Sequence, residues 1–227
     1  MHRVQKILSN RGYCSRRKAE VLIEDGRVSV NDKKITIGDQ AEEDDKITVD
    51  GTEVKKVRKT YILFNKPHGC VTALTDPRYK TIMDYIRLKE RVFPVGRLDY
   101  NTEGMLILTN DGDFANKVSH PSHEIKKTYL VGLTELLPEN KFNMLEKGLE
   151  IDGKKVKPHK VELYEKDMVA ITIHEGMNRV IRKMMLKLDL KIRFLKRIKI
   201  GRLKLGFLST GKFRKLKPEE LDLILQK

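Results

Sequence analysis

FPVGRLDYNTEGMLILTNDG, residues 93–112, sets one aspartate between two glycine turns and ahead of an apolar strand. Gly96 and Gly104 allow backbone conformations that β-branched residues resist. The run MLIL that follows Gly104 predicts a buried strand, and the Asp-Gly pair at 111–112 predicts the turn that closes it. Asp99 therefore lies on a loop that is supported on both sides. By spacing alone, such a charged loop is more often structural than catalytic, although functional residues favour loops.

The same stretch resembles the GRLD motif of pseudouridine synthases. Its longer form, TEG-x-L-x-L-TNDG, resembles the RsuA/RluB branch of that family, which modifies ribosomal RNA. The resemblance implies that Asp99 is the catalytic carboxylate of an enzyme that detaches uracil from its ribose and reattaches it through carbon 5. It implies no cofactor.

Composition indicates an ordinary soluble protein. With 227 residues, 39% of them hydrophobic, the chain can bury one good core and a small second one. No run approaches the roughly 18 apolar residues of a membrane span, and the N-terminus lacks the apolar stretch of a signal peptide, so we expect a cytoplasmic protein. Cys14 and Cys70 predict free thiols, and the six histidines lack metal-ligand spacing. No metal site is expected.

The positive charge is concentrated in one segment. Residues 176–217 hold 15 Lys and Arg against a single acid, Asp189, whereas the rest of the chain is nearly neutral. Such segregation favours a surface that contacts phosphates. A merely soluble lysine-rich surface and an anionic membrane surface are the alternatives, and the second lacks a companion apolar face. We expect ribosomal RNA or a pre-ribosomal particle as the partner, no membrane, and a monomer.

Residues 1–58 predict a small separate module of two short helices followed by short strands. Gly12 and Gly26 each end a helix, and Ser15 can cap the second one. The first turn of that helix carries Arg16, Arg17 and Lys18, whose charges oppose the helix dipole at a cost of about 0.3–1 kcal/mol each. A phosphate bound at this helix start would reverse the sign of that effect.

This module resembles the S4 RNA-binding domain. Ser15-Arg16-Arg17 and the run GRVSVN at 26–31 match the pattern of that domain, although Asn31-Asp32 stands where it usually has Asn-Gly. The resemblance implies that Arg16, Arg17 and Lys18 bind RNA. The acidic stretch 39–50 is expected to face away from RNA, and we place the domain boundary near residue 58.

Residues 59–227 alternate between strand-like and helix-like runs, which predicts an α+β domain. The expected strands are 61–66, 105–109, 128–133, 168–174 and 192–200, and the expected helices are 138–147, 178–188 and 218–226. The resemblance extends this to the pseudouridine synthase fold, with a bent, mainly antiparallel sheet and a central basic cleft.

Two further motifs supply candidate partners for Asp99. KTYLV at 127–131 resembles the family's Lys-Thr-Tyr strand, which implies that Tyr129 stacks on the flipped base and moves the proton from carbon 5. A tyrosine in a strand is otherwise simply a good strand former. EGMNRVIRKM at 175–184 is similar to the family's E-G-[RK]-N-R-Q-V-R-R-M. This match implies that Arg182 pairs with Asp99 and that Ile181 lines the base pocket.

The second motif departs from the family at two positions, because Met177 replaces Arg or Lys and Val180 replaces Gln. Arg179 within it is a candidate substrate-binding residue. An alternative interpretation is a core helix whose basic residues, Arg179 and Arg182 included, are simply solvated.

Two more basic residues are candidate RNA contacts. Arg97 precedes the aspartate by two residues, and the resemblance implies that it helps to hold the target nucleotide out of its stack. Moving a base out of its stack costs a few kcal/mol. Lys66, in KPHG at 66–69, resembles the family's Lys-Pro-x-Gly loop, for which we expect an RNA contact near the cleft. A plain turn is the alternative for that loop.

The sequence thus favours a site-specific rRNA pseudouridine synthase that acts on the large-subunit (23S) rRNA. A small-subunit (16S) enzyme and a non-catalytic rRNA-binding ribosome-assembly factor are the alternatives. A glycoside hydrolase or nuclease would need a second catalytic carboxylate or a metal cluster, which no residue pattern supplies.

Overall fold

The computed structural model describes residues 1–174 and 177–226. The chain divides into two compact units. The first comprises Met1–Tyr61, Leu88–Phe93 and Leu108–Ala115, and the second comprises Ile62–Arg87, Pro94–Ile107 and the chain from residue 116 onward. No helix in the described part is long and apolar enough to cross a membrane.

The first unit begins with the two predicted helices, α1 (Val4–Asn10) and α2 (Arg16–Glu24). Gly12 and Gly26, which follow them, both have positive φ, as a helix end of this kind requires. The short strands of this unit are β1 (His2–Arg3), β2 (Val28–Val30), β3 (Lys33–Lys34), β4 (Gln40–Ala41), β5 (Ile47–Val49) and β6 (Thr52–Glu53). They form a two-stranded sheet, β1-β4, and a four-stranded sheet, β3-β2-β5-β6, and the apolar stripes of both helices pack with β2 and β5 in one core.

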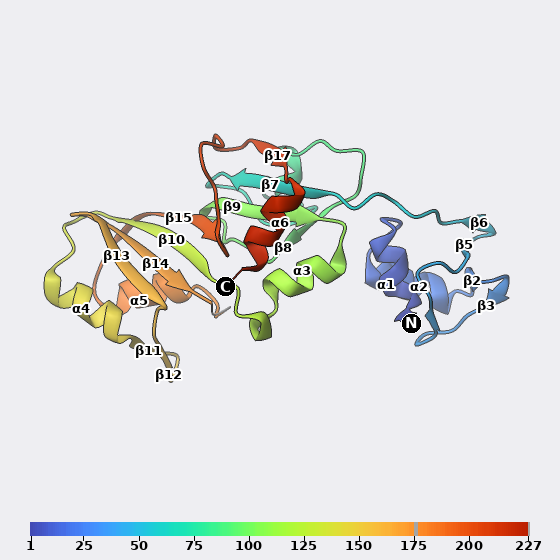
Figure 1. The fold of residues 1–227 in the computed structure, drawn as a ribbon, viewed down its shortest axis with the longest axis horizontal. Helices are drawn as coiled ribbons and strands as arrows, with labels where there is room; N and C mark the ends of the chain where they lie inside the picture. Colours follow the sequence, from blue (N-terminus) through green and yellow to red (C-terminus); the bar gives the residue numbers. More distant parts are fainter. Residues whose placement is uncertain (175–176, 227) are drawn as a thin grey trace. The chain divides into compact units, whose positions relative to one another are not determined.

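The second unit is built on a sheet of nine described strands. Figure 1 shows the strands from β13 to β17 along its main path. Its main order is β13-β14-β10-β15-β9-β7-β17, with β16 on β15 and β8 on β9. The strands are β7 (Tyr61–Lys66), β8 (Phe93–Val95), β9 (Glu103–Thr109), β10 (Lys127–Leu133), β13 (Lys160–Glu165), β14 (Met168–Ile173), β15 (Ile192–Ile200), β16 (Leu203–Lys204) and β17 (Phe213–Lys215).

The predicted mainly antiparallel arrangement is confirmed. β10 runs antiparallel to β14 and β15, β13 to β14, and β7 to β17, whereas β9 and β15 are parallel. Because β9 and β15 are far apart in the chain, their pairing brings the end of the Asp99 loop beside a strand some ninety residues later.

Helices α4 (Glu139–Lys147), α5 (Val180–Lys187) and α6 (Pro218–Leu225) lie within the predicted ranges. Strand β9 ends at Thr109, and the Asp-Gly pair that was predicted to close it with a turn leads directly into the helix α3 (Gly112–Ser119). Asp111 caps it: a side-chain oxygen accepts the backbone N–H groups of Asp113 and Phe114, both at 3.1 Å. The remaining elements are the hairpin β11 (Leu149–Ile151) and β12 (Lys154–Val156), and the short 3₁₀ helices η1 (Ile82–Asp84) and η2 (Pro121–His123).

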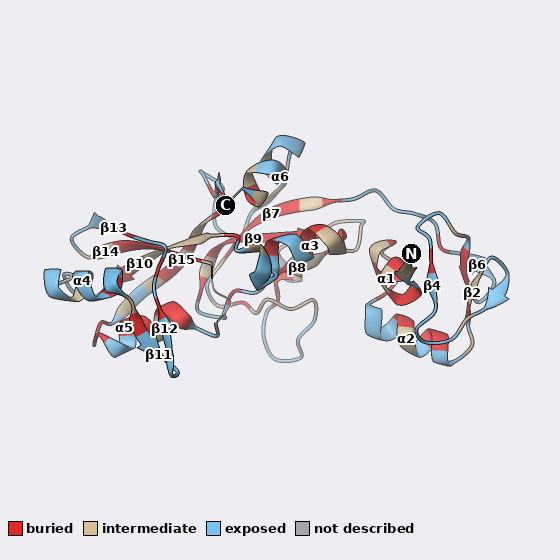
Figure 2. Ribbon diagram, turned by 60° about the horizontal axis from the view of Figure 1, so that its bottom comes forward, coloured by how far each residue is buried: buried red, intermediate tan, exposed pale blue. Residues whose placement is uncertain are grey.

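The core of the second unit fixes the elements that carry the candidate site. Val180, Ile181, Met184 and Met185 of α5 pack with buried residues of β10, β14 and β15. Figure 2 shows buried residues along β10, β14, β9 and β7. The start of α5 is therefore held against the strand that carries Tyr129.

Candidate active site

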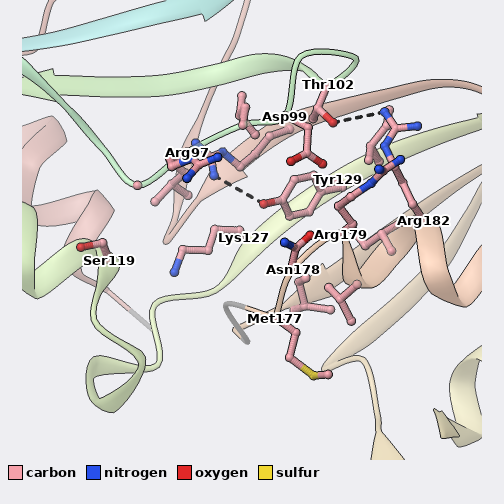
Figure 3. Close-up of a pocket in the computed structure, with 18 of the residues that line it drawn as sticks. Arg97, Asp99, Thr102, Ser119, Lys127, Tyr129, Met177, Asn178, Arg179 and Arg182 are labelled. Atoms are coloured by element: carbon pink, nitrogen blue, oxygen red, sulfur yellow. Dashed lines mark hydrogen bonds between the residues drawn. The ribbon is translucent and has the colours of Figure 1, made fainter. Parts of the chain in front are cut away.

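A pocket of about 420 Å³ opens within the second unit. Its polar lining comes from five segments of the chain, and Figure 3 shows side chains from most of them around the pocket. These residues are Arg97, Asp99 and Thr102 of the loop before β9, Ser119 of α3, Lys127, Tyr129 and Arg197 of β10 and β15, and Asn178, Arg179 and Arg182 around the start of α5. Asp99 is the only acid among the described lining residues, beside five lysines and arginines.

The loop that carries Asp99 is fixed by its glycines. Gly96 and Gly104 have φ of +72° and +104°, in the region that disfavours side chains, as their positions in the sequence predicted. Gly104 lies opposite Arg197 in the parallel β9–β15 pair, where a Cβ atom would collide with the Arg197 backbone. The loop can therefore approach β15 only because this residue has no side chain.

Lys66 supports the same loop from behind, and the prediction that it contacts RNA is wrong. Its side chain is fully buried, and its Nζ atom donates to the carbonyl oxygens of Asp99 at 3.1 Å and Thr102 at 2.9 Å. The carbonyls of Pro67 and Tyr100, at 3.0 and 3.5 Å, complete its shell. Burial lowers the pKa of the Lys66 ammonium, and the nearby charges of Cys70 and Asp99 oppose that change. The ammonium group thus binds the loop backbone and is not available to a ligand.

The Asp99 carboxylate itself faces the pocket and is exposed in the free protein. Figure 3 shows it directed toward the ring of Tyr129. Its backbone is restrained by a turn in which the Thr102 N–H donates to the Asp99 carbonyl at 3.0 Å. Neighbouring Leu98 is buried and bonds through its backbone to the Thr72 hydroxyl. A single carboxylate is thus presented on a rigid loop.

The direct ion pair predicted between Arg182 and Asp99 is absent among the described residues. The Arg182 guanidinium donates instead to the Asn101 carbonyl at 2.5 Å and to the Thr102 hydroxyl at 3.2 Å. Burial lowers the pKa of this guanidinium, the charge of Asp99 opposes that change, and the charge of Arg179 adds to it. Both hydrogen bonds come from Nη2, and the buried Nε atom has no hydrogen-bond partner among the described residues. The guanidinium therefore acts on the aspartate through the loop and through space. It does not point to open solvent, as the core-helix alternative required.

Tyr129 lies on β10 and is half-buried, with its hydroxyl beside Arg197. No sequence motif pointed to Arg197, which belongs to the basic segment 176–217. Its side chain is 4% exposed; Nε donates to the Met105 carbonyl at 2.7 Å, and Nη1 reaches the Tyr129 hydroxyl at 3.4 Å. The guanidinium carbon also lies 5.9 Å from the centre of the Tyr129 ring, a distance at which a cation and an aromatic ring attract. Alternation along β15 could have revealed it, since Leu195 and Arg197 face the same side.

Lys127 is a second residue whose place the sequence did not predict. It begins β10 and lines the pocket, and desolvation together with the charge of Arg197 lowers the pKa of its amine to about 8. No described carboxylate lies within 4 Å of this group to form an ion pair. Among the described residues, this pocket lysine therefore has no ion-pair partner.

The other predicted residues of this region divide between surface and core. Arg97 and Arg179 are exposed at the pocket, and Arg179 has the left-handed conformation, with φ of 55°, where α5 begins. Ile181 is buried, with 3% exposure, and contributes to the wall of the pocket. Met177 lines it as well. Glu175 and Gly176 of the same motif lie outside the described residues.

The basic segment is less uniform than its sequence suggests. Arg197 is buried, Arg193 pairs with Asp167 at 2.8 Å, and Arg214 pairs with Glu220 at 2.6 Å. Burial and ion pairing therefore occupy some of the cations of this segment. In the first unit, Arg16, Arg17 and Lys18 are fully on the surface of α2, and Ser15 caps that helix through Lys18 N–H at 3.2 Å.

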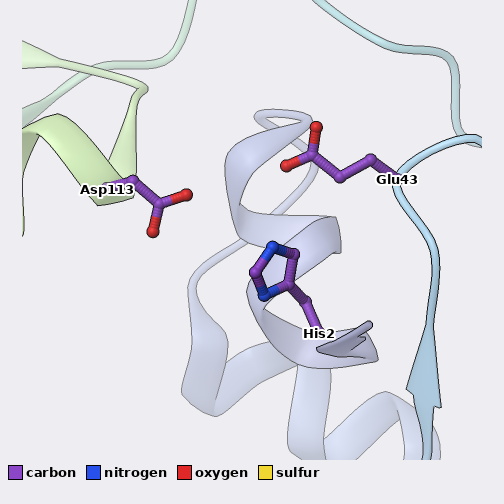
Figure 4. A group of neighbouring side chains, drawn as sticks. All are labelled: His2, Glu43 and Asp113. Carbon is purple, nitrogen blue, oxygen red and sulfur yellow. The ribbon is translucent and has the colours of Figure 1, made fainter.

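Cys14 and Cys70 are free and buried. One group among the described residues of the first unit could hold a metal ion by proximity alone: ligand atoms of His2, Glu43 and Asp113 lie within 4.8 Å of one another, as drawn in Figure 4. Asp113, however, pairs with Lys6 at 2.6 Å, and the same ammonium lies 3.4 Å from the His2 ring. A cation already occupies this position, so the group does not support a metal site.

Comparison with known proteins identifies the class. The RNA pseudouridylate synthase family matches residues 60–187, and the S4 domain matches residues 2–47. The chain therefore belongs to the RNA pseudouridylate synthase family, and it carries an S4 domain at its N-terminus.

Particular relatives extend over nearly the whole chain. It is 39% identical to the ribosomal large subunit pseudouridine synthase B of Bacillus subtilis (strain 168), over 97% of this chain and 94% of that protein. It is 34% identical to the dual-specificity RNA pseudouridine synthase RluF of Escherichia coli (strain K12), over 96% of this chain and 77% of RluF. A crystal structure described as a pseudouridylate synthase superposes with a TM-score of 0.72 at 28% identity, covering 99% of this chain and all of that one.

Proposed function

We propose that this protein isomerises uridine to pseudouridine at a specific site in ribosomal RNA, and that the target lies in large-subunit rRNA, either free or within a pre-ribosomal particle. The observation that carries the proposal is the pocket that gathers Asp99, Tyr129 and Arg182 from three separate segments. The large-subunit assignment rests on the 39% identity to the Bacillus subtilis enzyme.

The reaction breaks the bond between ribose C1′ and uracil N1 and forms a bond between C1′ and C5. The C5 proton leaves, and N1 gains a proton, so substrate and product are isomers and no oxidant, reductant or water is consumed. As the first bond breaks, the Asp99 carboxylate stabilises the positive charge that develops at C1′. Because the carboxylate is already held on a rigid loop, the protein does not have to reorganise around it. Tyr129 stacks on the freed uracil and removes the C5 proton after the ring has turned.

The cations of the pocket serve the substrate around this centre. Arg182 holds the loop at Asn101 and Thr102, and thereby the aim of Asp99. Ile181 supports the base, while Arg97 and Arg179 contact the RNA backbone, which a flipped nucleotide exposes beside the pocket. Arg16, Arg17 and Lys18 of the S4 domain anchor the RNA and take no part in the chemistry.

Release of tritium from RNA labelled at uridine C5 tests the activity directly, because each isomerisation loses one C5 proton. Transcripts of large- and small-subunit rRNA domains are compared, and the modified position is mapped by carbodiimide treatment and primer extension. We expect release from a large-subunit transcript, none with Asp99→Asn, and normal release with Glu135→Gln, which removes an exposed charge outside the pocket.

Two outcomes would assign another function. Release confined to small-subunit transcripts would make the protein a small-subunit enzyme. Tight RNA binding without any release by the unmodified protein would make it an assembly factor.

A further inference from the structure

Three aromatic rings lie together on the surface beside Asp99, outside the residues that line the pocket. Tyr100 follows Asp99 in the chain, so their Cα atoms are about 3.8 Å apart. Its ring centre lies 5.3 Å from that of Tyr79, edge to face, and 6.2 Å from that of His68. Tyr79 is 53% exposed and Tyr100 41%. Together His68, Tyr79 and Tyr100 form what we term the aromatic platform.

The platform is held in place by hydrogen bonds of its backbone. A side-chain oxygen of Asp76 accepts the N–H groups of Arg78 and Tyr79, both at 2.9 Å, which fixes the turn that presents Tyr79. The Gly69 N–H donates to the Tyr100 carbonyl at 3.0 Å, which joins the His68 loop to the Asp99 loop. The rings therefore keep a defined position relative to the carboxylate.

Packing does not account for rings at this position. Both tyrosines leave a large part of their surface in water, and that part does not stabilise the fold. Within the described residues, neither phenolic hydroxyl has a hydrogen-bond partner. The cluster thus has neither a core role nor a polar role within the chain.

Its surroundings match single-stranded RNA. Arg78 and Lys80 flank Tyr79 and are exposed, and Arg97 is exposed on the loop that leads to Asp99. Exposed rings next to lysine and arginine side chains are the combination that binds unpaired bases, since the rings stack on the base and the cations contact the phosphates. An enzyme that flips a uridine out of its stack also leaves the neighbouring base without its stacking partner.

We propose that the aromatic platform is a second nucleotide subsite, which stacks the unpaired base adjacent to the target uridine. This inference rests on the proposed function and deepens it, because it places a specificity contact outside the catalytic pocket. When the uridine flips, the neighbouring base loses its stacking partner, and the rings of the platform replace that partner. The platform thereby lowers the free-energy cost of flipping and fixes which uridine enters the pocket.

The test uses an RNA fragment that the wild-type protein isomerises. 2-Aminopurine, whose fluorescence is quenched by stacking, replaces each of the two nucleotides flanking the target, one at a time. We expect added protein to change the fluorescence at one of the two positions. Tyr79→Ala and Tyr100→Ala should each abolish that change and weaken RNA binding about tenfold, whereas Tyr79→Phe and Tyr100→Phe should preserve both. Tyr164→Ala, which removes a 63% exposed tyrosine of β13, is the matched control and should change neither.

The platform is refuted if both alanine variants, folded by circular dichroism, bind the fragment as the wild type does and keep the fluorescence change. Phenylalanine variants as weak as the alanine variants would also overturn it, because the hydroxyls and not the rings would then be in contact. Wild-type activity separates the two proposals. An active wild type with unaffected variants refutes the platform alone, whereas a wild type that isomerises no fragment of ribosomal RNA refutes the proposed function.

Discussion

One lysine is removed from solvent beside the loop that carries Asp99, and another on the strand that carries Tyr129. The two lysines differ in whether the protein supplies partners for their charge. Lys66 is fully buried, and its ammonium group lies within hydrogen-bond distance of four backbone carbonyl oxygens. Lys127 is partly buried, lines the pocket and has no ion-pair partner among the described residues. A satisfied buried cation stabilises the backbone around it, whereas an unsatisfied one costs stability until an anion arrives. The loop therefore needs no ligand to satisfy Lys66, whereas we expect an anionic group of the substrate to neutralise Lys127 on the strand.

Replacing each lysine with methionine gives the sharpest contrast. Lys66→Met leaves several buried carbonyls without a donor and should lower the free energy of unfolding by about 3 kcal/mol, or about 10 °C in Tm. Lys127→Met removes a desolvated charge and should leave stability unchanged or slightly higher. Thermal unfolding at pH 7 measures both. Equal losses in the two variants would mean that the lysines play the same structural role.

Arg182 extends the comparison to the rigidity of the loop. Arg182→Met removes the donor to Asn101 and Thr102, so Asp99 should be aimed less well, and we expect kcat to fall about 100-fold with a smaller change in KM. Lys183→Met, which removes the neighbouring cation that pairs with Asp152, serves as the control. A change confined to KM would show that Arg182 only binds RNA.

The pKa of Lys127, about 8, predicts that the contribution of this residue to RNA affinity depends on pH near neutrality. We expect no such dependence from Lys66. If Lys127 contacts a phosphate, RNA affinity should be full below pH 7 and fall about tenfold as the pH rises through 8 and the amine loses its charge. Lys127→Arg keeps its charge and should abolish this fall. Affinity independent of pH between 7 and 9.5 in the wild type would remove Lys127 from the RNA contacts.

The lowered pKa of Lys127 also affects stability, which should rise with pH where RNA affinity falls. Between pH 8 and about 10.5, the unfolded chain holds a proton that the native Lys127 has released. The contribution of this residue to the free energy of unfolding should therefore rise with pH across that window. Subtracting the pH profile of Lys127→Met from that of the wild type isolates the effect, which would be contradicted by a difference that falls with pH.

The exposed cations of α2 should have the smallest effect on chemistry. Arg16→Ala, Arg17→Ala and Lys18→Ala together should weaken RNA binding about tenfold or more and flatten its dependence on salt, because each lost phosphate contact lowers the slope by about 0.9. The kcat at saturating RNA should stay within about twofold. A large loss of kcat in the triple variant would place the S4 domain in the active site.

Local sequence determined much of this protein. The alternating and apolar runs predicted the strands around β7, β9, β10, β14 and β15, Pro138 and Pro218 marked the starts of α4 and α6, and the glycines around Asp99 predicted the loop. These features depend on backbone propensities and periodicity, which act over a few residues. Motif resemblance added the family and the S4 domain, and the comparisons confirm both.

Tertiary structure alone decided which cations serve the backbone and which serve a ligand. Lys66 meets carbonyls more than thirty residues later, and Arg197 reaches Met105 and Tyr129 only because β15 pairs with β9 on one side and β10 on the other. Arg182 bonds to Asn101 and Thr102 across some eighty residues, where the sequence predicted a direct pair with Asp99. A lysine or arginine has the same charge in any sequence context. Its partner is set by strand pairing and burial, because a charge removed from water takes whichever acceptors the fold places within reach.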